Sequence, residues 1–324
     1  MPLAPRFWYQ ESSPYAYWLR PFSWLYKSLV IARRICYQIG LKKTIKFSVP
    51  IVVVGNITVG GTGKTPFVIG LTNWLKEQGF HPGIVSRGYG GKQSNLKVVT
   101  ATSDPHRVGD EAVLIVKKTN CPMVVCSDRP LAVKKLLMDY DCDIIVSDDG
   151  LQHYALGRNI EIAMVDSDRL FGNRFCLPAG PLREPMSRLK TVDFMVMHGE
   201  TTQKNSMQLR HTALYQLKNP NNFFPMEVLK NKVIHAVAGI GAPHRFFQQL
   251  EKLDATVMAH PFPDHHRYQP SDFNFGDEAM IVMTEKDAVK CQSFDDQRLW
   301  CVTAEAVLSP EFLLRFQRRL ELFN

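Results

Sequence analysis

The stretch VPIVVVGNITVGGTGKT, residues 49–65, is the part of the chain that predicts the fold. Its apolar run, residues 51–54, is rich in β-branched side chains and short enough to form a buried strand. A glycine-rich turn follows, then Lys64, Thr65 and Pro66, and a proline suits the first turn of a helix. Apolar side chains then recur at helical spacing as far as Leu75. Strand, glycine-rich turn, Lys-Thr and helix form the order that a phosphate-binding loop requires.

Such a loop binds phosphate because glycines let backbone N–H groups surround the phosphate oxygens at a helix N-terminus. Lys64 can reach the β- and γ-phosphates, and the Thr65 hydroxyl can bind Mg²⁺. The usual spacing has a glycine where this chain has Thr58, so the loop is a variant. The alternative is a tight glycine turn between any strand and helix. ATP and Mg²⁺ are the predicted cofactors, and the predicted nucleotide-binding residues are Thr58, Val59, Gly60, Gly61, Thr62, Gly63, Lys64 and Thr65.

Two adjacent carboxylates end a second apolar strand, in CDIIVSDDG, residues 142–150. In enzymes with a phosphate-binding loop, an acid at such a strand end helps to hold Mg²⁺. Asp148 and Asp149 are therefore predicted site residues, and the alternative is an ordinary strand end. Gln152 and His153 follow closely, and either can touch a substrate, although a single histidine is more often structural.

Three further pairs of polar side chains lie beside predicted strands, helices or loops: Arg87 with Tyr89, Asp110 with Glu111, and Arg183 with Glu184. The first pair stands in a glycine-rich loop after a strand, where α/β proteins place ligand contacts. The second begins a helix, and the third stands in a proline-bounded loop, where it can steady phosphate and metal. Each pair has a structural alternative: a flexible turn, acids that complement the helix dipole, or a surface turn.

Positive charge gathers at the start of the chain. Residues 1–46 carry eight Lys or Arg and one acid, in a chain of 324 residues with net charge +8. Because the remainder is nearly neutral, a nucleic-acid surface is not expected.

The N-terminal segment, residues 1–46, is also rich in Trp and Tyr. Residues 21–40 predict a helix with a broad apolar face and a narrow polar stripe (Ser23, Lys27, Arg34, Gln38). This composition favours a helix on a membrane surface; the alternative is a helix packed on the core with its basic side chains in water.

The rest of the chain predicts alternating strands and helices. No apolar run is long enough to span a bilayer, no signal peptide is expected, and seven scattered cysteines are typical of a reduced, cytoplasmic protein. The predicted fold is α/β: a P-loop NTPase-like α/β/α domain (47–222), a smaller α/β domain (223–324) that the last helix completes, and an N-terminal amphipathic helix (1–46). In the smaller domain GIGAPH, residues 239–244, lacks the third glycine of a dinucleotide-binding turn and is interpreted as structural.

With these residues in view, the chain resembles the tetraacyldisaccharide 4′-kinases, the lipid A 4′-kinases of outer-membrane biogenesis. The matching strings are VGNITVGGTGKTP, SRGYGG, VGDEA, SDDGLQH, LPAGPLREP, AGIGAPHRFF, FPDHH and TEKDAVK. They follow the family's order over nearly the whole chain. The family's loop also has a threonine at position 58, so the variant spacing supports the resemblance.

The resemblance implies a phosphotransferase that moves the γ-phosphate of ATP to the 4′-hydroxyl of a tetraacyldisaccharide 1-phosphate. Asp110 matches the family's proposed base and His265 its partner, with His266 beside it as an alternative partner. The implied catalytic residues are Asp110, His265, Lys64 and Asp149; the implied metal ligands are Thr65, Asp148, Glu111 and Glu184. The implied substrate contacts are Arg87, Tyr89, Arg129, Gln152, His153 and Arg183.

The resemblance also implies a peripheral protein on the cytoplasmic face of the inner membrane. Its expected partners are the lipid disaccharide 1-phosphate and the membrane surface, without nucleic acid or an obligate protein partner. Two alternatives remain: a membrane-associated regulatory ATPase or GTPase, and a non-catalytic nucleotide-binding scaffold. In TEKD, residues 284–287, the lysine stands one place too late for the guanine-reading pattern Asn/Thr-Lys-x-Asp, which favours ATP over GTP.

Overall fold

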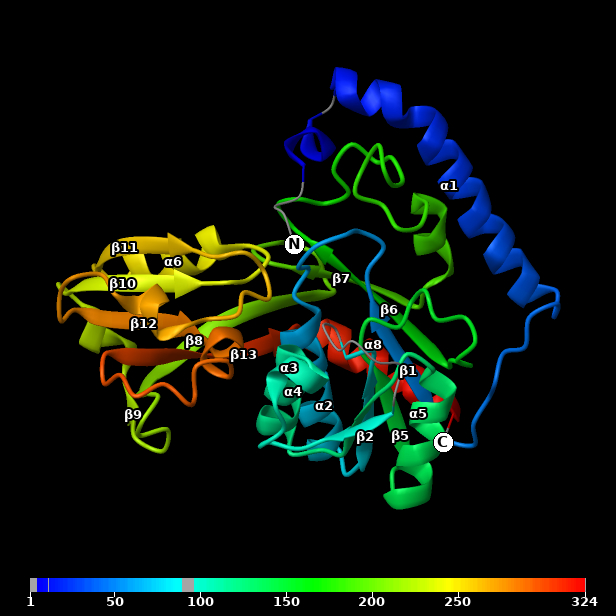
Figure 1. The fold of residues 1–324 in the computed structure, drawn as a ribbon. Coiled ribbons are helices and arrows are strands. Elements are labelled where there is room, and N and C mark those ends of the chain that lie inside the picture. The colour runs from blue at the N-terminus through cyan, green and yellow to red at the C-terminus, as the bar shows by residue number, and fades with distance from the viewer. Residues whose placement is uncertain (1–4, 11, 89–95, 324) are drawn as a thin grey trace.

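One sheet runs through the computed structural model, which describes residues 5–10, 12–88 and 96–323 (Figure 1). In this part of the chain the sheet has thirteen strands: twelve follow the order β11-β10-β12-β13-β8-β7-β6-β1-β5-β2-β4-β3, and β9 pairs with β8 off this path. The strands are β1 (Ile51–Gly55), β2 (Pro82–Ser86), β3 (Lys97–Val99), β4 (Met123–Val125), β5 (Ile144–Ser147), β6 (Ile160–Asp166), β7 (Phe194–His198), β8 (Ser206–Gln216), β9 (Phe223–Phe224), β10 (Val233–Ala238), β11 (Thr256–Pro261), β12 (Met280–Thr284) and β13 (Leu299–Leu308).

The sheet has two mostly parallel parts joined by one antiparallel pair. Strands β7, β6, β1, β5, β2 and β4 run parallel in the N-terminal half, and β11, β10, β12 and β13 run parallel in the C-terminal half. The long strands β13 and β8 pair antiparallel between them. Parallel neighbours need crossover connections, and several of them here carry α-helices, among them α2, α4, α5 and α6. The predicted α/β class is therefore confirmed.

Helices cover both faces of the N-terminal half. The helices are α1 (Pro14–Gln38), α2 (Lys64–Glu77), α3 (Pro105–Val108), α4 (Asp110–Thr119), α5 (Arg129–Asp139), α6 (Pro243–Glu251), α7 (Glu285–Ala288) and α8 (Pro310–Leu320). Buried side chains of α2, α4 and α8 form one core cluster with the sheet, and those of α5 belong to the cluster on the opposite face. This is the three-layer arrangement that the alternating pattern predicts.

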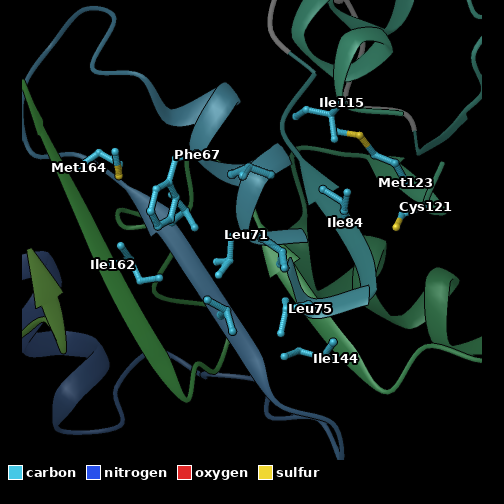
Figure 2. Close-up of a cluster of buried hydrophobic side chains, with 14 of the residues drawn as sticks. Phe67, Leu71, Leu75, Ile84, Ile115, Cys121, Met123, Ile144, Ile162 and Met164 are labelled. Atoms are coloured by element: carbon cyan, nitrogen blue, oxygen red, sulfur yellow. The ribbon is translucent and has the colours of Figure 1, made fainter. Parts of the chain in front are cut away.

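Strand β1 shows why its sequence is apolar throughout. Val52 and Val54 pack in the cluster that contains Phe67 and Leu71 of α2, two side chains labelled in Figure 2. Ile51 and Val53 pack in the cluster of α5. These four residues of β1 are at most 1% exposed. Side chains of a strand alternate between its two faces, so a strand covered on both faces needs apolar residues at every position. The buried strand predicted before the phosphate loop is thus confirmed.

The last helix lies where the sequence did not predict it. We expected α8 to complete the C-terminal unit, but Phe312 and Phe316 are fully buried in the same cluster as Phe67, with the rings of Phe67 and Phe312 5.6 Å apart. The reason is the length of β13, which extends past the predicted end at Val302 and returns the chain to the N-terminal half. The limits proposed for the two domains stay a prediction.

This packing predicts a stability effect. Phe312→Ala should lower the free energy of unfolding by about 3–5 kcal/mol, because it removes a buried ring and leaves a cavity beneath α2. Urea denaturation of the purified protein measures the change. Phe223→Ala is the control, since the Phe223 side chain is 58% exposed. Equal effects of the two substitutions would contradict the placement of α8.

Helix α1 turns a row of large apolar side chains away from the rest of the protein. It lies along the outside of the N-terminal half (Figure 1). An apolar stripe recurs every three or four residues and is 61% to 76% exposed; it consists of Tyr15, Trp18, Phe22, Leu25 and Leu29. None of the helices within residues 5–10, 12–88 and 96–323 combines the length and the apolar run needed to cross a membrane.

The inner face of α1 is partly polar. The Ser23 hydroxyl is buried and donates to the Cys176 carbonyl at 2.8 Å, and Arg34 donates to the Thr191 hydroxyl at 2.9 Å. Two members of the predicted polar stripe therefore contact protein. The alternative in which the apolar face of this helix packs on the core is wrong.

Candidate active site

The phosphate loop, residues 56–65, joins β1 to the first turn of α2. Gly63 caps α2 with φ of 80°, a left-handed conformation that favours glycine. A Cβ atom there would lie 2.5 Å from Nδ1 of His198, so a larger residue is excluded on steric grounds as well. The loop therefore needs its glycine for both backbone conformation and close packing.

Two distant segments hold the phosphate loop in place. The Val59 amide donates to the Pro181 carbonyl at 2.8 Å, and the Arg183 amide donates to the Ile57 carbonyl at 2.6 Å. From the C-terminal half, the backbone of Gly241 packs closely against Gly61. A Cβ atom added at Gly241 would lie only 2.9 Å from the Gly61 nitrogen. The turn at residues 239–244 thus contacts the phosphate loop, a role that its sequence did not reveal.

Lys64 reaches back across the loop to two oxygen atoms. Its Nζ lies 3.2 Å from Asn56 Oδ1 and 3.4 Å from Asp149 Oδ1. Asp149 also accepts from Arg183 at 3.2 Å and has φ of 47°, which is uncommon for a residue with a side chain. Burial raises the pKa of Asp149, but the charges of Lys64 and Arg183 outweigh it and hold the pKa at about 2. Lys64, Asp149 and Arg183 therefore form one charged group at the phosphate loop.

Asp148 has the properties of a metal ligand. Its Oδ2 accepts from Ser86 at 3.1 Å, while its buried Oδ1 has no hydrogen-bond partner among the described residues. Burial and the negative charges of Glu111 and Asp149 raise the pKa of Asp148 to about 7. A divalent cation would relieve this repulsion and satisfy the unpaired oxygen. Asp148, with the hydroxyl of buried Thr65, thus fits Mg²⁺.

Glu184 and Gln152 are occupied within the protein. The carboxylate of Glu184 is 1% exposed and accepts from the Tyr154 hydroxyl and, at 2.9 Å, from Gln152 Nε2. The same Gln152 nitrogen donates to the Asn56 carbonyl at 3.0 Å. These bonds tie the end of β5 to the phosphate loop, which gives both side chains a structural role. A metal contact of Glu184 and a substrate contact of Gln152 stay predictions.

Three predicted substrate residues gather beyond β2 and β5. Arg129 is 1% exposed and donates to the Asp148 carbonyl at 2.8 Å. Burial lowers the pKa of Arg129 to about 10; the carboxylates of Asp148 and Asp149 oppose this effect, and the positive charge of Arg87 adds to it. Burial, with Arg129 and Arg87, lowers the pKa of His153 to about 4. The cluster is therefore positive and suits an anionic ligand, while Tyr89 lies outside the described residues.

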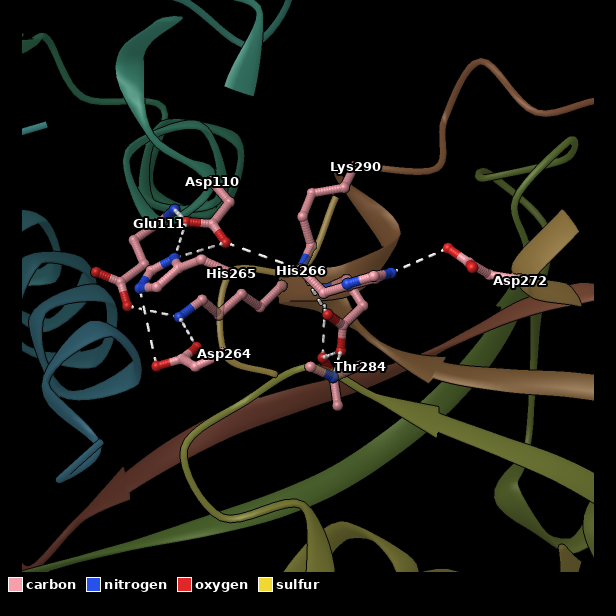
Figure 3. Close-up of polar contacts among 11 residues, drawn as sticks. Asp110, Glu111, Asp264, His265, His266, Asp272, Thr284 and Lys290 are labelled. Carbon is pink, nitrogen blue, oxygen red and sulfur yellow. Dashed lines mark hydrogen bonds and ion pairs between the residues drawn. The ribbon is translucent and has the colours of Figure 1, made fainter. Parts of the chain in front are cut away.

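Asp110 and His265 come from opposite halves and form a pair (Figure 3). His265 Nδ1 lies 3.0 Å from Oδ1 and 3.1 Å from Oδ2 of Asp110. His265 has φ of 62°, a conformation of the kind that gathers at functional sites. His266 instead bonds Asp272, with Nε2 3.0 Å from Oδ2. The geometry thus pairs Asp110 with His265.

Asp110 is held in its ionised form. Burial raises its pKa, but the hydrogen bond from His265 and the charges of Lys286 and Lys290 outweigh burial and keep the pKa below its usual value. Glu111, which follows Asp110, lies near enough to Asp148 for its negative charge to raise the pKa of that carboxyl. Asp149, the next residue after Asp148, pairs with Lys64 of the phosphate loop at 3.4 Å. We therefore assign the Asp110–His265 pair and the phosphate loop to one candidate site.

Comparison with known proteins decides the family. The sequence model described as Tetraacyldisaccharide-1-P 4'-kinase matches residues 15–321. The chain belongs to this family. It is 58% identical over 316 residues to the tetraacyldisaccharide 4'-kinase of Coxiella burnetii, covering 97% of this chain and 94% of that one. The corresponding protein of Methylobacillus flagellatus is 49% identical over 310 residues, covering 94% and 92%.

A solved member of the family has the same fold. The crystal structure described as the "apo" form of LpxK from Aquifex aeolicus in complex with ATP matches with a TM-score of 0.78. It is 28% identical and covers 95% of this chain and 99% of that chain. The family and the P-loop kinase fold predicted from sequence are confirmed.

Several residues that shape this kinase-family site were not predicted from sequence. Lys290 lies 3.9 Å from Asp110, Lys286 pairs with the adjacent Glu111, and Asn56 bonds Lys64. Lys286 belongs to TEKDAVK, a string that carried the family resemblance but had no assigned role. Asn56 stands inside the quoted phosphate loop, where its side chain had no motif to identify it.

Proposed function

We propose that this chain is the ATP-dependent kinase that phosphorylates the 4′-hydroxyl of a tetraacyldisaccharide 1-phosphate in lipid A biosynthesis. The kinase activity and the use of ATP with Mg²⁺ are those of its family. The observation that carries the proposal is the Asp110–His265 contact, which joins the N-terminal half, where the phosphate loop lies, to the C-terminal half. A nucleotide phosphate at the loop and an acceptor hydroxyl at the pair suit this arrangement.

The proposed mechanism rests on positioning and charge. Phosphoryl transfer needs little covalent work from the protein, so catalysis comes from aligning the reactants and stabilising the moving charge. Lys64 offsets charge on the migrating phosphoryl group, and ionised Asp110 accepts the proton of the acceptor hydroxyl. His265 orients Asp110 through its Nδ1 contact and helps Asp110 to accommodate the proton that it accepts. Mg²⁺, held by Thr65 and Asp148, would neutralise phosphate charge when bound with ATP.

One assay separates the proposed function from its alternatives. The purified protein is mixed with ATP labelled at the γ-phosphate and a tetraacyldisaccharide 1-phosphate in detergent micelles. The kinase proposal expects label on the lipid. Label released only to water would indicate a regulatory ATPase, and unchanged ATP in the presence of lipid would indicate a scaffold.

We also propose that the protein sits on the cytoplasmic face of the inner membrane. The support is the outward apolar stripe of α1, because five large side chains exposed in one row are costly in water and suit a lipid surface. Basic residues beside the stripe would attract anionic lipid headgroups. An enzyme at the surface reaches the sugar of its substrate while the acyl chains stay in the bilayer.

The double substitution Trp18→Glu with Leu25→Glu should weaken binding to liposomes by at least about tenfold, because it places charge where apolar burial is expected. Cosedimentation with vesicles that contain anionic lipid measures the binding. Met138→Glu is the control, since Met138 is 73% exposed on α5, away from the stripe. Unchanged vesicle binding of the double variant would remove α1 as the membrane contact.

A further inference from the structure

Lys286 connects the two halves beside the Asp110–His265 pair. Its Nζ lies 2.8 Å from Glu111 Oε1 and 3.0 Å from Asp264 Oδ1. The Lys286 side chain is 14% exposed, so these ion pairs are shielded from water far more than pairs on the surface. Burial lowers the pKa of Lys286, but three nearby carboxylates outweigh it and raise the pKa, which keeps the ammonium charged.

The two partners of Lys286 are the sequence neighbours of the pair. Glu111 follows Asp110 at the start of α4, in the N-terminal half. Asp264 precedes His265 in the loop after β11, in the C-terminal half (Figure 3). A single ammonium therefore fixes the residue next to each member of the pair.

We propose that Lys286 is a positioning residue for phosphoryl transfer, which sets the distance between Asp110 and His265 by binding Glu111 and Asp264 together. This inference rests on the proposed function. Lys286 acts through the two carboxylates, and its role is distinct from that of Lys64, which lies at the phosphate loop.

Charge explains why a cation is needed at this point. Asp110, Glu111 and Asp264 bring three carboxylates to one junction between the halves, and like charges in a shielded place repel strongly. Lys290 offsets part of this charge from the other side, at 2.8 Å from Asp287 and 3.9 Å from Asp110. Without Lys286, Glu111 and Asp264 would lose their shared partner, and repulsion would widen the gap between Asp110 and His265.

A second ion pair provides a matched control. Lys118 near the end of α4 pairs with Glu285 at the start of α7, so it joins the same two helices as the Lys286–Glu111 pair. It does so at the opposite end of α4, two turns or more from Asp110. Loss of Lys118 tests whether any ion pair that joins α4 to α7 has the same effect on kcat as the pair made by Lys286.

The experiment compares Lys286→Met, Lys286→Arg and Lys118→Met in the labelled-phosphate assay with lipid acceptor. For Lys286→Met we expect kcat to fall at least about 30-fold while KM for ATP stays within about threefold, since misplaced catalytic groups slow the reaction without weakening nucleotide binding. Lys286→Arg keeps the positive charge, so its kcat should be at least about tenfold higher than that of Lys286→Met. Lys118→Met should keep kcat within about threefold of wild type.

Each outcome has a consequence. A Lys286→Met protein with unchanged kcat, a Lys118→Met protein with an equal loss, or no recovery in Lys286→Arg would overturn the inference. If Lys286→Met fails to fold, Asp264→Asn tests the same link, because Asp264 is 27% exposed; a kcat equal to wild type would then overturn the inference. Wild-type protein that transfers no phosphate would refute the proposed function instead.

Discussion

Asp110→Asn should lower kcat by at least about 10²-fold, the effect expected from loss of a general base. Asparagine keeps the size of the side chain and can still accept the hydrogen bond that Asp110 Oδ1 takes from the Glu111 amide at 2.9 Å. It carries no negative charge and cannot take a proton from an acceptor hydroxyl. The start of α4 is therefore preserved while the chemistry is removed. Steady-state transfer of labelled phosphate to the lipid measures kcat, and calorimetry with ATP measures nucleotide binding, which should change little.

Asp128→Asn controls for the other role that an acid at a helix start can have. Asp128 caps α5, with Oδ1 accepting from the Leu131 amide at 3.1 Å. Asparagine caps a helix as well as aspartate does, so this variant should keep kcat within about twofold. If both variants lost activity equally, Asp110 would be a residue that only complements the helix dipole.

Local signals predicted the parts of the site that one strand and one turn determine. The run that ends in GKT predicts both a buried strand and a phosphate-binding helix start, because β-branched residues, glycines and the Lys-Thr pair each require a particular backbone. Asp148 and Asp149 were placed at a strand end by the same logic. These residues lie together because β1 and β5 are parallel neighbours.

Contacts between distant segments were beyond reach from a single sequence. The place of Lys286 depends on how the C-terminal half meets α4, which no local spacing records. Strand β8, residues 206–216, was not predicted, since its character comes from pairing with β13 ninety residues later along the chain. The packing of α8 was predicted wrongly for the same reason. Such features depend on tertiary contacts, and propensity does not determine them.

The second large effect concerns the phosphate loop. Lys64→Met should lower kcat by about 10³-fold, because the ammonium is lost from the place where charge develops on the transferring phosphoryl group. Methionine retains much of the length of the side chain and has high helix propensity, so α2 should still begin at this position. The substitution also leaves Asp149 with Arg183 as its remaining close cation, and the pKa of Asp149 should rise from about 2. Single-turnover transfer, measured with excess enzyme, separates this loss from product release.

Lys76→Met, on the same helix, shows how much of the effect is structural. Lys76 Nζ donates to the Thr119 carbonyl at 2.6 Å and so joins α2 to the end of α4, far from the loop. Its loss should cost stability of about 1 kcal/mol, the usual value of one hydrogen bond, and leave kcat within about twofold. If the Lys64→Met protein transferred phosphate as fast as the Lys76→Met protein, the GKT segment would be only a tight glycine turn between a strand and a helix. Both variants remove one ammonium from α2, so a large difference between them reports what the Lys64 ammonium does at the phosphate loop.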